Sequence, residues 1–305
     1  MKHYNDYIVN FMKRYDYPKE AVKVLSDVEK RLDSDKGFGS AFDKIMDSFK
    51  ADGDFRKAEE SLDELEKASG VDERTLKFIF IMNSSEWVKE KYAEKGISEK
   101  VFWDTFEDLK WKLQECMECE NTVGTFVASW FRLHLALEIF ALGRFQYQLT
   151  EYDKDEPYIG SDGTMLKKGD HLVAVHIPSS GISLKDEVRY DSYKKAHEFF
   201  KELFPDGITK MECGSWLLYG KHREFLPQHM NILRFMDDFD ILTCDEHDSF
   251  GDDWRIFGHY SDLPVEEFPT DTSLRKAYKE WLLSGNKSGS GYGIIMFDGE
   301  NIVNK

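Results

Sequence analysis

The stretch 171–219 constrains the fold more than any other part of this chain. Residues 171–177 are short, apolar and β-branched, as a buried strand is. Residues 178–183 (PSSGIS) follow, and their proline cannot continue a central strand because it lacks a ladder donor. Residues 190–204 carry apolar side chains at helical spacing, and residues 208–219 suit a second buried strand. This order predicts a parallel strand–helix–strand crossover.

The loop between the first strand and the helix is the best candidate for an anion site. Free backbone N–H groups and the positive end of a helix dipole lie at such a loop. The small residues Ser179, Ser180, Gly181 and Ser183 would let a ligand approach the backbone, so we take them as the cofactor-binding candidates. An ordinary turn with helix-capping serines remains the alternative.

The pattern divides the chain into a helical half, residues 1–142, and a mixed half, residues 143–305. Apolar residues recur at helical spacing from about residue 4 onward, with a predicted interruption at 37–39. Residues 125–142 are the most apolar stretch and predict one buried helix that ends at Gly143. The fold class is therefore α+β, with an all-helical domain followed by a mixed α/β domain.

Alternation and turn residues predict the remaining elements of the second half. We expect strands at 143–149, 239–244, 252–260 and 292–297, a helix at 273–284, and a hairpin or loop at 151–169. The glycine-rich residues 289–293 precede a strand, whereas a phosphate-binding loop leads into a helix. We therefore interpret them as a flexible connection.

Composition narrows the classes of function. The chain of 305 residues is 41% apolar and has a formal net charge of -17, which argues against nucleic-acid binding and against docking to anionic membranes. It has no apolar run long enough to cross a bilayer and no apolar signal core, so we expect a cytoplasmic protein. The four cysteines fit reduced thiols.

Cys116 and Cys119 form a CxxC pair on a predicted helix. Such a pair suits zinc or redox chemistry, but the sequence offers no second CxxC or HxxxH to complete a four-ligand site. Two ordinary helix cysteines are the alternative, and we expect no metal.

Several motifs resemble a bacterial two-part family with an N-terminal helical N-acyltransferase domain and a GNAT-like C-terminal domain. They are WFRLHL at 130–135, LGRFQ at 142–146, VHIPSSG at 175–181, CGSWLL at 213–218, EFLP at 224–227 and NILRF at 231–235. The resemblance covers about residue 98 to the end of the chain.

The resemblance implies a GNAT-like fold and an acyl-CoA co-substrate. In GNAT folds acyl-CoA lies between two splayed parallel strands, with its pyrophosphate on the loop after the first. Here those strands correspond to 171–177 and 210–218, and the loop to 178–183. The usual loop, Gln/Arg-x-x-Gly-x-Gly/Ala, does not match PSSGIS. Either the anion is held differently or CoA is not the ligand.

His176, Glu212 and Cys213 are the catalytic candidates. His176 would end the first strand, at the sheet edge where open α/β sheets bind ligands, and its pKa suits a general base. Cys213 on the neighbouring strand could pair with it as a thiolate nucleophile, although strand alternation can separate the two side chains. Glu212 would lie on the face opposite Cys213. A buried, backbone-bonded histidine and a packed core cysteine are the structural alternatives.

The substrate-binding candidates are Arg144, Ser215, Trp216, His222 and Arg234, which lie in or beside the matching motifs. The cationic residues could hold a carboxylate or phosphate, or pair with acidic neighbours. Two functions follow. The first is an acyl-CoA-dependent N-acyltransferase, in which an amine attacks the thioester and His176 or Glu212 takes the proton. The second is a non-catalytic or different-ligand protein that binds a small molecule or a protein partner. The sequence leaves the oligomeric state open.

Overall fold

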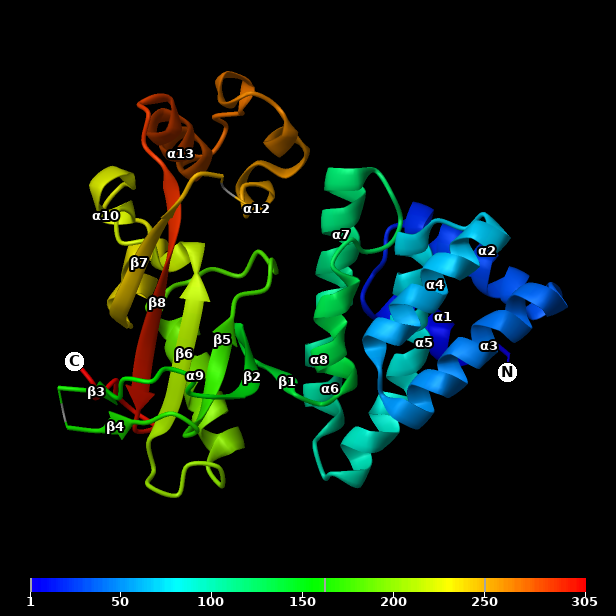
Figure 1. Cartoon of the computed structure of the whole chain (residues 1–305), viewed down its shortest axis with the longest axis horizontal. Helices are drawn as coiled ribbons and strands as arrows, with labels where there is room; N and C mark the ends of the chain where they lie inside the picture. The colour runs from blue at the N-terminus through cyan, green and yellow to red at the C-terminus, as the bar shows by residue number, and fades with distance from the viewer. Residues whose placement is uncertain (1, 162, 250) are drawn as a thin grey trace. The chain divides into compact units, whose positions relative to one another are not determined.

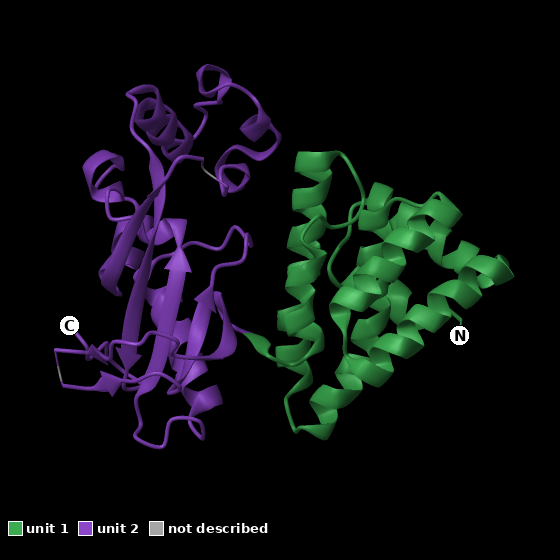
Figure 2. Cartoon of the chain, in the orientation of Figure 1, with its two compact units in different colours: residues 1–140 green, residues 141–305 purple. Residues whose placement is uncertain are grey.

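The chain consists of two compact units, residues 1–140 and 141–305. The structure, a computed structural model, describes residues 2–161, 163–249 and 251–305 (Figures 1 and 2). The first unit is helical, and the second combines a sheet with helices, which confirms the predicted α+β class.

The first unit is a bundle around one long helix. Its helices are α1 (Asp6–Arg14), α2 (Lys19–Ser34), α3 (Lys36–Asp52), α4 (Phe55–Ser69), α5 (Glu73–Glu94), α6 (Glu99–Phe106), α7 (Asp108–Glu120), the 3₁₀ turn η1 (Ala128–Phe131) and α8 (Arg132–Leu135). Residues 78–85 of α5 are all buried, so this part of the helix is surrounded on every side, whereas the other long helices bury one face.

A close approach explains why α3 contains two glycines. We predicted an interruption at 37–39, but both Gly37 and Gly39 lie inside α3, which Asp35 caps by accepting from the amides of Gly37 and Phe38. A Cβ on Gly39 would lie 2.2 Å from the carbonyl oxygen of Leu32. Glycine therefore lets α3 pack against the end of α2.

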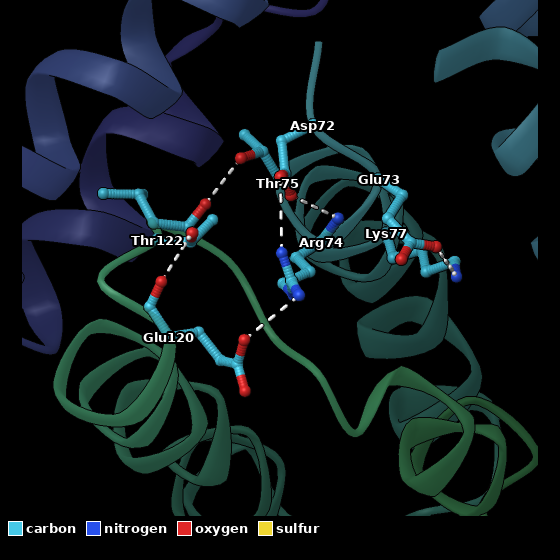
Figure 3. Close-up of polar contacts among 8 residues, drawn as sticks. Asp72, Glu73, Arg74, Thr75, Lys77, Glu120 and Thr122 are labelled. Atoms are coloured by element: carbon cyan, nitrogen blue, oxygen red, sulfur yellow. Dashed lines mark hydrogen bonds and ion pairs between the residues drawn. The ribbon is translucent and has the colours of Figure 1, made fainter. Parts of the chain in front are cut away.

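The start of α5 is fastened to the segment that follows α7 (Figure 3). Thr75 Oγ1 donates to the carbonyl of Val123 at 2.6 Å, and Arg74 pairs with Glu120 at 3.1 Å. A Cβ on Gly124 would lie 2.4 Å from the carbonyl carbon of Arg74, so the two segments meet backbone to backbone. Side-chain caps and close backbone packing together fix this end of the bundle.

The predicted helix at 125–142 is wrong. The stretch forms η1, the short α8 and then strand β1 (Ile139–Leu142). Leu137 adopts a positive φ of 59°, which breaks the helix before the strand. Gly143, also at positive φ, lies in the turn from β1 to β2 instead of ending a helix.

The second unit contains a six-stranded sheet in the order β1-β2-β5-β6-β8-β7. Its strands are β2 (Phe145–Glu151), β5 (His171–His176), β6 (Thr209–Ser215), β7 (Asp240–His247) and β8 (Ser288–Phe297), together with β1. A two-stranded hairpin, β3 (Tyr158–Ile159) with β4 (Met165–Leu166), confirms the hairpin expected within 151–169. The helices and turns are α9 (Asp186–Phe200), η2 (Trp216–Leu218), α10 (His222–Phe225), α11 (Asn231–Asp237), α12 (Trp254–Phe257), η3 (Gly258–Asp262), η4 (Val265–Glu267) and α13 (Ser273–Leu283).

The predicted crossover is confirmed: β5 and β6 pair in parallel, and α9 connects them. α9 packs on one face of the sheet, where Tyr193 stacks on Phe145 with ring centroids 5.6 Å apart. Ser192 Oγ accepts from the amide of Phe145 and donates to the carbonyl of Leu142, which joins α9 to the β1–β2 turn. The buried Arg189 forms an ion pair with Asp238 and ties α9 to the end of α11.

The opposite face of the sheet is covered at one end by the β3–β4 hairpin. Its core cluster comprises Tyr152, Tyr158, Leu166, Leu172, Ile294 and Met296. Asn304, near the end of the chain, donates to Tyr158 Oη and accepts from the Met296 amide, which locks the hairpin region to β8. The cluster does not extend to the other end of this face of the sheet.

Two predictions for the second half are wrong. Residues 252–260, expected as a strand, form α12 and part of η3, so the alternating pattern there does not reflect a pleat. Residues 289–293, expected as a flexible connection, lie within β8. A Cβ on Gly291 would lie 2.2 Å from the Leu218 carbonyl oxygen, so glycine in this strand permits close backbone packing.

The glycine pair in α3 gives a matched test of close packing. We expect Gly39→Ala to lower the free energy of unfolding by about 1–3 kcal/mol, because backbone must move to admit the new Cβ. Gly37→Ala, where a Cβ meets only the Asp35 side chain at 3.5 Å, should be neutral or stabilising by up to about 1 kcal/mol. Urea unfolding measures both. Equal effects of the two variants would contradict the packing argument.

A buried carboxyl group in the first unit makes its stability depend on pH. Glu29 in α2 is fully buried; Oε1 accepts from Asn83 Nδ2 at 2.8 Å, and Oε2 lacks a hydrogen-bond partner among the described residues. Burial raises the pKa of Glu29 to about 8. The folded chain therefore keeps a proton that the unfolded chain loses near pH 4.5.

This carboxyl should make the folded state less stable as the solution becomes alkaline. The native form binds the extra proton, so stability is full below about pH 4.5 and falls by on the order of 4 kcal/mol as the pH rises through 8. Glu29→Gln should remove that slope, whereas Asp27→Asn, on an exposed site of the same helix, should retain it. Urea unfolding at pH 5.5 and 8.5 gives the change in the free energy of unfolding for each variant. The same change in Glu29→Gln as in wild type would show that Glu29 is not the group responsible.

Candidate functional site

The two parallel strands β5 and β6 stay together for only part of their length. Their parallel register consists of Val173 with Met211 and Ala174 with Glu212. Both strands then continue, β5 to His176 and β6 to Ser215, without further paired residues in this described region. The strands therefore separate towards their carboxyl ends, where open α/β sheets bind ligands.

A pocket of about 370 Å³ lies over β2, β5 and β6 on the face of the sheet opposite α9, and its lining includes His176 and Gly214 near the separated carboxyl ends. Its lining residues are Gln148, Thr150, Glu151, Asp153, Lys154, Ala174, Val175, His176, Glu212, Gly214 and Tyr292. The registers explain why strand residues gather here: Gln148 pairs with Ala174, Ala174 with Glu212, and Gly214 with Tyr292. Paired residues point to the same face, so polar side chains from four strands meet.

Glu212 and Tyr292 form a hydrogen-bonded pair on the pocket wall. Tyr292 Oη donates to Glu212 Oε2 at 2.6 Å. Burial raises the pKa of the Glu212 carboxyl, and the hydrogen bond from Tyr292 partly opposes this effect. Lys154 lies over the Tyr292 ring at 5.1 Å, and its ammonium pairs with Asp153 at 2.7 Å. Glu212 is thus a half-buried proton acceptor in reach of the pocket.

His176 occupies the end of β5 on the same face. Its Nε2 lies 3.0 Å from Gln148 Oε1. Because this amide oxygen only accepts, Nε2 carries the proton in this arrangement and Nδ1 carries the lone pair. The side chain of Gln148, on β2, therefore fixes the tautomer of the half-buried His176 imidazole. A general base needs such a fixed orientation.

Cys213 lies on the other face of β6. It pairs in register with Gly293, between residues 212 and 214 that line the pocket, and its side chain is buried. Burial raises the pKa of the Cys213 thiol, so a thiolate is disfavoured. The structure brings His176 and Glu212 together at one pocket and separates Cys213 from both.

The loop from β5 to α9 keeps its small residues near the surface. Ser179 and Gly181 are exposed, and Gly181 adopts a positive φ of 71°. Ser180 Oγ accepts from the amide of Ile182 at 3.4 Å, and Ser183 Oγ accepts from Asn231 Nδ2 at 3.0 Å. Ser183 therefore joins the loop to α11, while Ser179, Gly181 and Ile182 before it are exposed.

The five substrate-binding candidates have different surroundings. Ser215 Oγ accepts from the Leu217 amide and caps η2, and Arg234 is exposed on α11. His222 is buried against Tyr278, with Trp216 and Phe225 packed edge-on around its ring. Burial lowers the pKa of His222 to about 4, so this imidazole is neutral and its surroundings are those of a core residue. Arg144 is buried beside the loop, where its Nη1 donates to the Pro178 carbonyl at 3.0 Å.

Sequence reasoning missed Gln148, Thr150, Asp153, Lys154 and Tyr292, which line the pocket. The signal for the first two was present, because residues 143–149 alternate and Gln148 and Thr150 share the polar face of that pattern. Nothing in the sequence indicates Tyr292. Its side chain reaches the pocket because β8 pairs with β6 there, and our sequence analysis interprets residues 289–293 of that strand as a flexible connection.

The described residues contain no group of three or more His, Cys, Asp or Glu placed to hold a metal ion. Cys116 is buried in α7, and burial raises the pKa of its thiol to about 12. Among the helices of the described chain, none combines the length and apolar character needed to cross a membrane.

Several solved structures share the fold of the whole chain. One is an acyltransferase in complex with decanoyl-CoA and teicoplanin: it is 19% identical, has a TM-score of 0.75, and the match covers 96% of this chain and 88% of that one. Another is an acyltransferase in complex with decanoyl-CoA, 22% identical with a TM-score of 0.72, covering 95% and 87%. The comparison with curated proteins found no match.

Family comparison covers both halves of the chain. Residues 6–137 match the N-acyltransferase N-terminal domain, and residues 139–295 match the GNAT-like C-terminal domain. The second match spans more than half of the 305 residues. The chain therefore belongs to the family that joins an N-acyltransferase N-terminal domain to a GNAT-like C-terminal domain.

Proposed function

We propose that this chain is an acyl-CoA-dependent N-acyltransferase whose reaction takes place in the pocket between β5 and β6. The observation that carries the proposal is the separation of these parallel strands, with His176 and Glu212 on the wall of the pocket formed there. Similar structures hold decanoyl-CoA or octanoyl-CoA, which supports an acyl-CoA as the donor.

The unpaired ends of β5 and β6 suit a thioester. Backbone N–H groups that do not pair across a widened gap can donate to a ligand that enters it, and a strand N–H near the reacting carbonyl stabilises the oxyanion as it forms. The acyl chain and the amine would then meet over the polar face that carries Gln148, His176 and Glu212.

The reaction is direct transfer. The amine nitrogen attacks the thioester carbonyl carbon, a C–N bond forms, and the C–S bond breaks. His176 Nδ1 accepts the proton that the nitrogen loses, and the CoA thiolate leaves and takes up a proton, which gives an amide and free CoA. The amine attacks in its neutral form, and the Glu212 carboxylate on the other side of the pocket accepts a hydrogen bond from an amine N–H.

A second function, binding of a different ligand without acyl transfer, is favoured by the loop. PSSGIS lacks the usual glycine pattern, and α9 begins with Asp186 and Glu187, whose carboxylates already compensate the positive end of its dipole. Binding of CoA separates the two functions. A ligand at about 100 times its Kd raises the free energy of unfolding by roughly 2.7 kcal/mol. Thermal unfolding with CoA, acetyl-CoA and decanoyl-CoA at millimolar concentration should show a shift, and no shift with any of them would reject the acyltransferase.

His176 should be required for turnover. We expect His176→Asn to lower kcat by about 10²–10⁴-fold, because the amide cannot accept the proton at neutral pH. His171→Asn removes an exposed imidazole at the other end of β5 and should leave kcat unchanged. Release of the CoA thiol, measured with decanoyl-CoA and a panel of primary amines, gives both values. Equal kcat for His176→Asn and wild type would rule out the histidine as the base.

Glu212 should shape the pH profile of kcat/KM. Its pKa is raised by burial, so kcat/KM should fall as the pH drops through a value above the usual carboxyl range, where the ionised form disappears. Glu212→Gln should abolish this fall of kcat/KM at low pH and should lower kcat/KM itself by about tenfold or more. Glu224→Gln, on an exposed site of α10, should reproduce the wild-type profile. An unchanged acid limb in Glu212→Gln would show that another group titrates there.

A further inference from the structure

The pocket on the polar face of the sheet already binds an ammonium group, which belongs to the chain itself. Lys154, in the segment between β2 and β3, lines the pocket, and its Nζ lies 2.7 Å from Asp153 Oδ1. The same Nζ lies 5.1 Å from the centroid of the Tyr292 ring, within the range of a cation–π contact. A carboxylate and an aromatic face therefore bind a cation at this wall of the pocket.

The Tyr292 ring is held in place by contacts other than the one with Lys154. Tyr292 pairs in register with Gly214, and a Cβ on Gly214 would lie 4.0 Å from Tyr292 Cδ2. The tyrosine hydroxyl donates to Glu212 Oε2 at 2.6 Å. Because β6 fixes the ring in this way, its face would stay available to a cation if the lysine moved away.

Lys154 occupies this place without being buried in it. Its side chain is 49% exposed and that of Asp153 is 74% exposed, and exposed ion pairs contribute little stability. The hydrogen bond to Asp153 and, at longer range, the charge of Glu212 raise the pKa of the Lys154 ammonium, so it is charged at neutral pH. An ammonium supplied by a ligand can therefore replace that of Lys154 at small cost.

The rest of the lining suits a polar cation better than an acyl chain. Carboxylates are contributed by Glu151, Asp153 and Glu212, whereas Lys154 is the cationic side chain among the described lining residues. A pocket lined mainly by one sign of charge concentrates ligands of the opposite sign. The excess of carboxylates therefore favours an acceptor that carries a positive charge in addition to the nitrogen that reacts.

We propose that the acceptor is a diamine, with one neutral nitrogen that attacks the thioester beside His176 and one ammonium that replaces Lys154 against Asp153 and the Tyr292 ring. The inference rests on the proposed function, because it names the class of amine that receives the acyl group. The ammonium keeps its proton and takes no part in the bond changes, so the products are the monoacylated diamine and CoA. Lys154 is then a residue that determines specificity, since its ammonium competes with that of the acceptor.

Calorimetric binding of 1,4-diaminobutane to the full chain, with and without CoA, tests the ammonium site without requiring turnover. We expect Lys154→Met to tighten binding by about three- to thirtyfold, because one cation–π contact and one exposed ion pair pass to the ligand. Adding Asp153→Asn to that variant should reduce the gain. Adding Tyr292→Leu should reduce it more than adding Tyr292→Phe; both lose the hydroxyl, so their difference isolates the ring.

Two variants beside the same hairpin control for net charge. Lys168 and Asp155 are exposed, pair with each other at 2.5 Å and lie outside the described lining of the pocket. Lys168→Met and Asp155→Asn change the net charge as Lys154→Met and Asp153→Asn do, and they should bind diaminobutane as wild type does. Equal tightening in Lys154→Met and Lys168→Met would overturn the site, because it would reflect bulk charge alone.

Release of the CoA thiol from decanoyl-CoA tests the class of acceptor. Diaminobutane, 4-aminobutanol and 4-aminobutyrate differ only in the group that would meet Asp153 and Tyr292. We expect kcat/KM to be about threefold or more higher for diaminobutane than for the other two, and Lys154→Met to raise it for diaminobutane alone. Preference for aminobutyrate that Lys154→Met removes would overturn the inference, since Lys154 would then bind a carboxylate of the acceptor.

Failure of the inference and failure of the proposed function give different results. Turnover of all three amines at equal kcat/KM would leave the acyltransferase standing and overturn the diamine. If no amine is acylated, the proposed function fails, and diaminobutane binding that still follows the Lys154 and Asp153 variants supports the ammonium site. Absence of diaminobutane binding to both wild type and Lys154→Met overturns that site.

Discussion

Two residue pairs, Val173 with Met211 and Ala174 with Glu212, are the parallel contact on which the second unit depends. They bring β5 and β6 together near the middle of each strand, and among the described residues no pairing continues to the two carboxyl ends. Continuous pairing would satisfy the strand amides and close the sheet, whereas separation leaves room for a pocket of about 370 Å³. The α9 side of the sheet is buried, and the β3–β4 hairpin covers one end of the opposite face with its own apolar cluster. The pocket lies on the part of that face that carries polar side chains.

Several buried polar contacts hold the edges of this arrangement. Ser192 joins α9 to the β1–β2 turn, and Arg189 with Asp238 joins α9 to α11. Both contacts are satisfied on each partner, so they specify position at little cost. Arg144 differs from them, because its guanidinium is buried without a carboxylate. A buried guanidinium without a carboxylate carries a desolvation cost that none of the described residues offsets.

The central unit was predictable because each of its parts has its own pattern. Residues 171–176 are apolar and β-branched, α9 has a helical stripe, and Pro178 marks the break between them. His176 could be placed at the pocket from its position at the end of β5. The polar face of β2, with Gln148 and Thr150, followed from alternation but was not assigned a role.

Other parts were not predictable for physical reasons. A continuous apolar run has no period that separates a buried helix from a buried strand, so residues 139–142 were assigned to a helix although they form β1. In β8, glycine reflects close approach of neighbouring backbone and not flexibility, as the 2.2 Å from a Gly291 Cβ to the Leu218 carbonyl oxygen shows. Such contacts are tertiary and leave no local signal.

Hydrogen–deuterium exchange of the full chain with and without decanoyl-CoA tests the central claim most directly. The account predicts slower exchange at 173–183 and 211–215, where the separated strands and the loop would bind the donor. The rest of the sheet, including β7, should exchange as before. Protection confined to other segments, with no change at these two, would contradict a donor site between β5 and β6.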